Sequence, residues 1–347
     1  MSTVHTRRHC IVPPYLLRAL LDSDDGSVRR TALNSLLTSA SIRGRRTALA
    51  GSLGMAADGR RTIFDVENGS ALARAAVVRT EDGPPAADDS ANKAFDGLGD
   101  TRQFYAEVFG RNSIDDRGLR LNGYIHRGVR FNNAFWDGLE MVFGDGDGVL
   151  FTDFTGSIDV IAHELTHGVT EHTAALEYHH QPGALNESIS DAFGEMVKQW
   201  TLNQTADEAD WLVGTEIFTP GVDADALRSM RAPGTAYDNA QFGQDPQPDH
   251  MDRYADLPDT DEGDYGGVHI NSGIPNKAFY LVATAIGGNS WNAPGHIWYE
   301  ALKASTATTD FSAFAATTYA QAVRLYGQTE QQAVRDAWEQ VGVEGAG

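Results

Sequence analysis

The sequence of 347 residues contains a single cysteine, Cys10. No intrachain disulfide is therefore available, so the fold must be stabilised by packing, by ions or by assembly. No stretch approaches the roughly 18 uninterrupted apolar residues that a membrane span requires. The first residues, MSTVHTRRHCIVPPYLL, lack the apolar segment and small-residue cleavage site of a Sec-type signal peptide. We expect no membrane partner, and a protein that is either cytoplasmic or secreted by a route without a visible signal peptide.

Basic residues are scarce, with 27 lysines and arginines against 48 acidic side chains and a net charge of -21. This balance argues against nucleic acid or an anionic membrane as a partner. Residues 1–50, which we call the leader, have the opposite balance. They contain eight arginines, no lysine and three aspartates, which gives a net charge of +5 and leaves -26 for the rest of the chain. A detachable segment docked over an acid-lined cleft would have this asymmetry, and so would chance variation over fifty residues.

The length exceeds the roughly 250 to 300 residues at which single cores stop growing, so two lobes are expected. Short alternating runs punctuated by Gly, Asp and Pro between residues 61 and 154 predict strands, with one helix near Asn92 to Phe109. Helical periodicity dominates from Asp159 onward. We predict an α+β fold: the leader 1–50 with a helix near Ser27 to Ile42, a strand-rich lobe 51–178 and a helical lobe 179–347.

The segment IDVIAHELTHGVTEHT contains the first candidate metal-binding residues. His163 and His167 are four residues apart, so on a helix their imidazoles lie one turn apart on one face and can bind one metal ion. Glu164 is rotated by about 100° and can address a water on that metal. The motif alone is equally compatible with a solvated helix whose histidines are hydrogen bonded.

A catalytic zinc ion needs a third protein ligand. Glu187 opens a second helical segment twenty residues after His167, and Asp191 lies on the same face, placed to accept the free N–H of an imidazole. A first-turn glutamate favoured by the helix dipole is the competing interpretation. The alternative HExxHxxGxxH pattern fails, because Thr170 and Thr173 hold the two required positions.

Several separated blocks extend the pattern: NNAFWDGLEMVFGDGDG, DVIAHELTHGVTEHTAALEY, GALNESISDAFGEM, IFTPG, LRSM and DYGGVHINSGIPNKAFY. With these blocks the chain resembles the thermolysin (M4) family of neutral metallopeptidases. The resemblance implies a two-lobed zincin whose strand-rich and helical lobes are joined by the zinc-binding helix.

The resemblance also implies roles for individual residues. Glu187 would be the third zinc ligand, with Asp191 and Asn186 supporting the ligands. Glu164 would be the general base, and the oxyanion would be held by zinc and two further groups. These groups would be Tyr178 and His269, the latter oriented by Asp264. Protein or peptide substrates follow from this set.

Substrate contacts are implied as well. Asn133 and Ala134 would run beside the substrate backbone, while Arg228 would bind a substrate carbonyl. The apolar pocket for the side chain after the scissile bond would be formed by residues that could equally belong to an ordinary core, namely Phe151, Phe154, Val160, Val213 and Leu227. This pocket predicts cleavage on the amino side of Leu, Phe, Ile or Val.

Calcium ligation departs from the pattern of long-form relatives, which hold a calcium pair beside the zinc helix. Asp159 and Asp210 match that pattern, but the other matching positions hold Lys198, Leu212 and Thr215. A lysine would place a cation where calcium is expected, so we predict that the pair is absent. A single calcium ion near Thr219, Val222 and Asp225 is compatible with the sequence.

The short leader resembles the propeptide of the protealysin-like subgroup, in which a Pro-Pro motif, here Pro13 and Pro14, belongs to a segment that keeps the enzyme latent. Cys10 would either offer a thiolate to the open zinc position or be a packed thiol. The run around SIRGRRTALAGSLG would be an exposed processing site. We expect a monomeric latent precursor with its own propeptide over the cleft. The alternatives are a catalytically silent zinc-binding protein, a permanently latent precursor and an aminopeptidase.

Overall fold

The structure, a computed structural model, describes residues 10–45 and 58–347. Its N-terminal part is built on a five-stranded sheet with the order β2-β1-β3-β5-β4. The pairs β1·β3 and β3·β5 are parallel, while β2 and β4 join the two edges antiparallel. The strands are β1 (Arg61–Asp65), β2 (Ala76–Thr80), β3 (Leu121–Ile125), β4 (Ala134–Trp136) and β5 (Glu140–Phe143).

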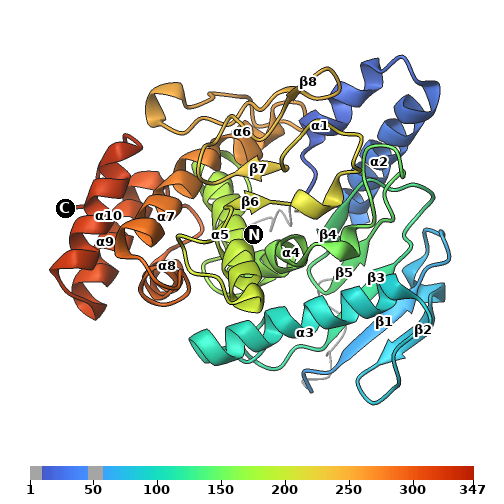
Figure 1. Ribbon diagram of the computed structural model, residues 1–347, viewed down its shortest axis with the longest axis horizontal. Helices are drawn as coiled ribbons and strands as arrows, with labels where there is room; N and C mark the ends of the chain where they lie inside the picture. Colours follow the sequence, from blue (N-terminus) through green and yellow to red (C-terminus); the bar gives the residue numbers. More distant parts are fainter. Residues whose placement is uncertain (1–9, 46–57) are drawn as a thin grey trace, which may run out of the picture.

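Helix α3 (Asp89–Phe109) packs along this sheet (Figure 1). It begins where the Asp88 side chain accepts a hydrogen bond from Ser90 N, and it ends at Gly110, whose φ of +65° suits glycine. Its buried face is a typical amphipathic stripe that includes Ala91, Ala94, Phe95, Leu98 and Phe104.

Two long central helices separate the sheet from the C-terminal part (Figure 1). They are α4 (Ile158–Glu171) and α5 (His180–Leu202), and they pack closely on each other. Gly194 permits this approach, because a Cβ atom there would lie 2.7 Å from the carbonyl oxygen of Asp159. Both helices are almost entirely buried, so their polar side chains face the interior of the molecule.

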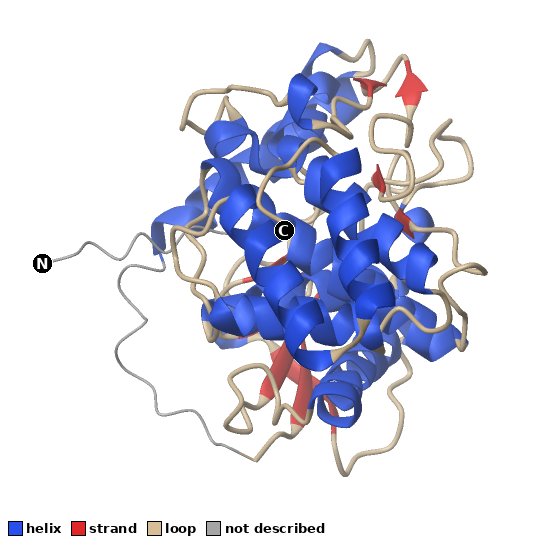
Figure 2. Cartoon of the chain, turned by 90° about the vertical axis from the view of Figure 1, so that its left-hand side faces the viewer, coloured by secondary structure: helices blue, strands red, loops and turns tan. Residues whose placement is uncertain are grey.

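The C-terminal part is mainly helical, with short two-residue strands before it. Figure 2 shows the larger sheet at one end of the molecule, the short strands apart from it, and helices filling most of the rest. The helices are α6 (Asp264–Asn271), α7 (Gly273–Ile286), α8 (Ala293–Ala304), α9 (Phe311–Leu325) and α10 (Gln328–Gln340), and the short strands are β6 (Leu212–Val213), β7 (Arg228–Ser229), β8 (Asp238–Asn239) and β9 (Gly243–Gln244). The predicted α+β class is therefore confirmed. None of the described helices is long and apolar enough to span a membrane.

The described leader residues form α1 (Pro14–Ala19) and α2 (Gly26–Arg45). Pro13 is extended and Pro14 occupies the first turn of α1, a position where proline is favoured. Leu16, Leu17 and Leu20 are fully buried in the main core. The predicted processing segment after α2 and the predicted boundary at residue 50 lie outside the described residues.

Candidate metal centre and active site

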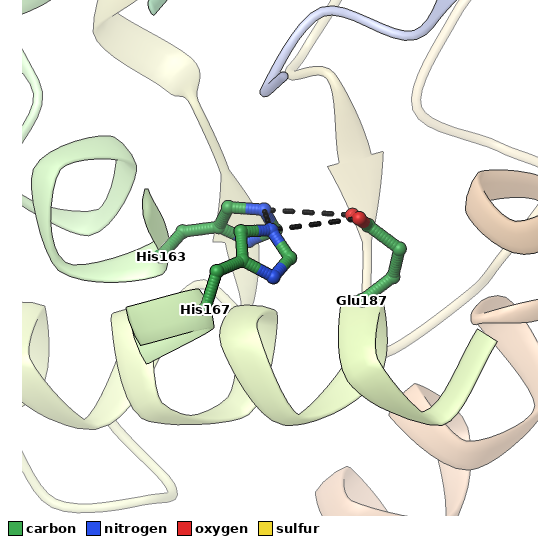
Figure 3. Close-up of side chains that lie close together, drawn as sticks. All are labelled: His163, His167 and Glu187. Carbon is green, nitrogen blue, oxygen red and sulfur yellow. Dashed lines mark hydrogen bonds and ion pairs between the residues drawn. The ribbon is translucent and has the colours of Figure 1, made fainter. Parts of the chain in front are cut away.

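The contact between α4 and α5 brings three donor side chains together. His163 and His167 project from α4 toward Glu187 on α5, as Figure 3 shows. The two imidazole Nε2 atoms are 3.0 Å apart, and each lies 3.5 Å from an oxygen of Glu187. All three side chains are at most 1% exposed.

These distances fit a tetrahedral zinc ion. Bonds of about 2.0 to 2.1 Å from one centre place neighbouring donors about 3.3 Å apart. Two imidazoles, one carboxylate and one remaining position for water are the donor set of a catalytic zinc site. Glu187 also stays ionised, because the charges of His269, His167 and His163 outweigh burial and hold its pKa well below the ordinary value.

Each imidazole is fixed by its second nitrogen. His163 Nδ1 lies 2.8 Å from Asp191, and His167 Nδ1 lies 2.9 Å from Asn186 and 3.0 Å from Ser190. Such partners select the tautomer that leaves Nε2 available for metal. The sequence had suggested Asp191 and Asn186; it missed Ser190, although Ser190 lies four residues after Asn186 on the same face of α5.

Asp191 links the metal-binding residues to Arg228, one of the predicted substrate residues. Arg228 makes a bidentate pair with it at 2.8 Å for both contacts, and Asn276 Nδ2 donates to it at 2.8 Å. Burial alone would raise the pKa of Asp191, but Arg228 and His163 hold it below the ordinary value. Sequence reasoning missed Asn276, whose only signal was its place in the block that contains His269.

Glu164 is buried beside the donor cluster. The backbone N–H of Trp136 donates to its Oε2 at 2.8 Å, while Oε1 has no hydrogen-bond partner among the described residues. Burial raises the pKa of Glu164 to about 7, so this carboxyl exchanges a proton near neutral pH. Strand β4 thus positions the predicted base through a backbone contact that no side-chain pattern could reveal.

Tyr178 and His269 meet on the other side of Glu187. The Tyr178 hydroxyl donates to Glu187 and lies 3.1 Å from His269 Nε2. Asp264 accepts from both His269 Nδ1, at 2.6 Å, and His269 N, at 2.8 Å. Although burial favours the neutral imidazole, Asp264 and Glu187 raise the pKa of His269, while burial and Glu187 keep Tyr178 protonated by raising its pKa.

The backbone before His269 is unusual. Residues 264–267 all have positive φ, from 52° at Tyr265 to 83° at Gly266. Glycines relieve only two of these four positions, so the turn depends on its hydrogen bonds, including Gly266 N to the Pro258 carbonyl at 3.0 Å. This turn directs the Asp264 carboxylate back onto His269.

The predicted substrate residues contact the leader. Asn133 pairs with the backbone of Val12 through its side-chain oxygen at 3.1 Å and its nitrogen at 3.3 Å. Ile11 N donates to the Ala134 carbonyl at 3.3 Å, and Arg228 Nη1 donates to the Ile11 carbonyl at 3.3 Å. Ala134 belongs to the edge strand β4, so the leader contacts that edge at Ile11.

The predicted apolar pocket residues are all buried in the main core cluster, which also contains Ile11. Phe151 stacks on Phe154 with ring centroids 5.8 Å apart, and Leu227 N donates to the Val213 carbonyl at 3.0 Å. Val160 is fully buried on α4. The structure therefore groups these residues near the zinc helix, and their part in specificity stays a prediction.

Cys10 is buried against the aromatic cluster of Phe131 and Phe135. An electrostatic interaction with Cys10 is a minor contribution to the raised pKa of Tyr178, so Cys10 lies near this tyrosine. Cys10 is not among the residues whose donor atoms converge on the zinc position in the described part of the chain. Whether it contacts zinc stays a prediction.

A second buried charged cluster lies at the far end of α5. Lys198 Nζ donates to Asp210 and to the Leu212 carbonyl at 2.8 Å and to Glu195 at 3.3 Å, and it lies 4.0 Å from Asp159. The predicted single calcium position is at the surface, where Thr219 donates to the Val149 carbonyl and Asp225 is exposed.

The site lies between a strand-rich and a helical lobe. It combines a HExxH helix, a carboxylate as the third metal donor, a buried carboxyl and a tyrosine–histidine pair. Together these features define a zinc-dependent peptidase. Family models described as thermolysin metallopeptidase, catalytic domain and alpha-helical domain, match residues 51–171 and 174–343. The chain belongs to the thermolysin family of metallopeptidases.

Individual relatives agree with this assignment. An extracellular metalloprotease of Pectobacterium carotovorum subsp. carotovorum is 44% identical over 339 residues, covering 96% of both chains. Bacillolysin of Bacillus amyloliquefaciens is 43% identical over 247 residues, or 71% of this chain and 43% of that protein. The solved precursor of protealysin from Serratia proteamaculans superimposes with a TM-score of 0.87 and 45% identity, covering 96% of this chain and 99% of that one.

Proposed function

We propose that this metallopeptidase is an endopeptidase made as a latent precursor, and that it cleaves peptide bonds on the amino side of bulky apolar residues. The observation that carries the proposal is the set of backbone contacts between Ile11, Val12 and the cleft residues Asn133, Ala134 and Arg228. A peptide chain already lies where a substrate backbone is expected to lie, which supports both a peptide-binding cleft and its blockage by the leader.

His163, His167 and Glu187 would hold a zinc ion, which would supply the Lewis acidity that activates water and polarises a carbonyl. Glu164 accepts the proton of the attacking water at Oε1 and later delivers it to the leaving amine. Trp136 N–H holds the other oxygen of Glu164 in place. Tyr178 O–H and protonated His269 donate hydrogen bonds to the developing oxyanion, each worth about 3 to 4 kcal/mol in related chemistry.

Glu164→Gln tests the catalytic assignment. This variant should keep the zinc ion bound by His163, His167 and Glu187 and lose about 10²- to 10⁴-fold in peptide hydrolysis. Hydrolysis by the parent should be abolished by a chelator and restored by zinc. A parent with bound zinc and no hydrolysis after removal of the leader would instead support the silent zinc protein.

The latent precursor is tested by the N-terminal sequence of the purified active protein. A start near residues 48 to 58, together with low activity of the full chain, supports removal of the leader. Full activity of a chain that still begins at Ser2 would make the leader a structural part of the enzyme. Peptides with a blocked amino terminus separate the two activities. An endopeptidase cleaves them at internal bonds, whereas an aminopeptidase requires a free amino terminus.

We also propose a role for Cys10 in latency. Its burial near Tyr178 supports either a thiolate that reaches the open zinc position or a thiol that packs against Phe131. Cys10→Ala in the Glu164→Gln background separates the two. With Co²⁺ in the site, loss of a thiolate ligand would remove a charge-transfer absorption band, whereas loss of packing alone would leave the spectrum unchanged.

The calcium pair is proposed to be absent because the Lys198 ammonium already neutralises the carboxylates there. This support is local: Asp159 and Glu195 are fully buried, and Lys198 is 6% exposed. Removing calcium with a selective chelator should then leave the melting temperature unchanged. A large decrease would point to calcium at this position or at the Thr219, Val222 and Asp225 stretch.

The location is inferred from a relative that is named as an extracellular metalloprotease. We propose that this chain is also secreted, by a route that its sequence does not identify. We further propose that it acts as a monomer, which sedimentation of the full chain would test.

A further inference from the structure

A second group of metal-type donors lies outside the active site, on the surface. His179, His180 and Asp259 each place one donor atom within 4.8 Å of the other two. His179 is partly buried, and the other two residues are exposed. His180 also has a positive φ of 48°, which turns the chain at the start of α5.

The hydrogen bonding of His179 resembles that of a metal ligand. Its Nε2 lies 2.8 Å from Glu177 Oε2, while its Nδ1 is buried, has no hydrogen-bond partner among the described residues and lies 3.8 Å from Asp259 Oδ2. If Nε2 carries the proton donated to Glu177, Nδ1 presents a lone pair toward a carboxylate. Two electron-pair donors facing each other favour a cation between them, and a carboxylate on the far nitrogen is the usual partner of a metal-bound histidine.

The backbone at Gly266 limits the position of the His180 ring. A Cβ atom at Gly266 would lie 2.3 Å from His180 Nδ1, so the ring rests directly on the backbone of the 258–266 loop. Asp259 belongs to the same loop. The imidazole pair and the carboxylate therefore come from two segments that already touch.

We propose that His179, His180 and Asp259 bind a second transition-metal ion, with water completing its coordination. Two imidazoles and one carboxylate suit Zn²⁺, and also Ni²⁺ or Cu²⁺, rather than Ca²⁺ or Mg²⁺. The donor atoms already lie within 4.8 Å of one another, and the exposed side chains of His180 and Asp259 can move to the spacing of about 3.3 Å that a tetrahedral ion needs.

The ion would clamp the loop that supports catalysis. His179 directly follows Tyr178, and the 258–266 loop carries Asp264, which orients His269. The leader also contacts this loop, because the Arg18 guanidinium donates to the Asp261 carbonyl at 2.8 Å and pairs with the Asp261 carboxylate. A metal clamp would keep this loop in place after the Arg18 contact is lost.

Zinc stoichiometry tests the site directly. The full chain is dialysed against rising free Zn²⁺, and zinc per chain is measured by elemental analysis. The parent and the control His172→Ala, an exposed histidine outside the cluster, should hold two ions, whereas His180→Ala and Asp259→Asn should hold one. The retained ion reports an intact catalytic site, so failure of this proposal is distinguishable from failure of the catalytic assignment. A parent with one ion, or cluster variants with two, would overturn it.

Glu177, the carboxylate partner of His179, allows a test by partial loss of affinity. Glu177→Gln should weaken the second site about 10- to 100-fold and leave the first unchanged. The clamp itself is tested by amide exchange: rising Zn²⁺ should slow exchange in residues 258–266 of the parent but not of His180→Ala. Equal exchange in both proteins would overturn the clamp.

Discussion

Helix α5 carries two buried charged clusters that are neutralised in different ways. Near its start, Glu187 and Asp191 face the imidazoles of α4; near its end, Glu195 faces the ammonium of Lys198. In the first cluster the imidazole Nε2 atoms and Glu187 form a donor set for a metal ion. In the second, the chain provides its own cation.

The difference shows how similar components give a reactive site or a structural one. Burial raises the pKa of Glu195 to about 8, with Lys198 acting against this rise, while Glu195, Asp159 and Asp210 raise the pKa of Lys198 despite its burial. A covalently attached ammonium leaves no position open for water. A zinc ion bound by three donors does, and this open position permits chemistry.

The largest expected effect is on the metal cluster. Glu187→Gln removes the anionic ligand, so the chain should lose the zinc ion bound with His163 and His167. Hydrolysis should fall by at least about 10⁴-fold, because metal activation and base catalysis are lost together. Elemental analysis and peptide hydrolysis after leader removal measure both quantities.

Glu195→Gln is the matched control for this change, since it alters a glutamate on the same helix in the other cluster. It should keep both zinc and activity. If it lost zinc to the same extent, the two clusters would not be functionally separate.

Lys198→Met tests the second cluster. The variant leaves buried carboxylates without their cation, which should lower the free energy of unfolding by about 3 to 5 kcal/mol. Chemical denaturation measures this, and the folded variant should still bind zinc. Lys303→Met, at a surface ion pair with Glu300, should change stability by less than about 1 kcal/mol. Equal effects at both lysines would contradict the assignment of Lys198 as an internal cation.

Asp191→Asn probes the support of the zinc ligands. Loss of its charge should weaken zinc binding about 10- to 100-fold, because Asp191 holds His163 Nδ1 and fixes Arg228. Competition with a zinc chelator measures the affinity. Asp210→Asn, a carboxylate of the second cluster, should leave zinc affinity unchanged, and an equal loss there would show that the two clusters are coupled.

His126 sharpens the comparison, because here a histidine acts as the cation between two carboxylates. It lies 2.8 Å from both Asp145 and Asp88, which raise its pKa to about 9. A raised folded-state pKa stabilises the protein fully below the unfolded value of about 6.5 and ceases to do so as pH rises through 9.

Relative to His126→Gln, the parent should therefore gain on the order of 1 kcal/mol at pH 6 and lose this advantage by about pH 10. Denaturation at several pH values measures the difference. A difference that stays constant with pH would assign His126 to packing alone.

The sequence by itself determined the main elements and the reactive side chains. Its helical periods predicted the segments that form α3, α4 and α5 because each buries a long apolar face, and the fixed spacing of HELTH placed two imidazoles on one turn. Family blocks then indicated Glu187, His269 and Tyr178. Domain boundaries, calcium and the specificity pocket stay predictions.

Only the tertiary structure decided the contacts that arise between distant segments or from the backbone. Trp136 N–H reaches Glu164 because β4 lies beside α4, and no side-chain pattern encodes a backbone donor. The left-handed turn at residues 264–267 depends on hydrogen bonds to Pro258 and Gly263. The enclosure of Lys198 likewise follows from packing, since only burial makes one lysine the counterion of several carboxylates.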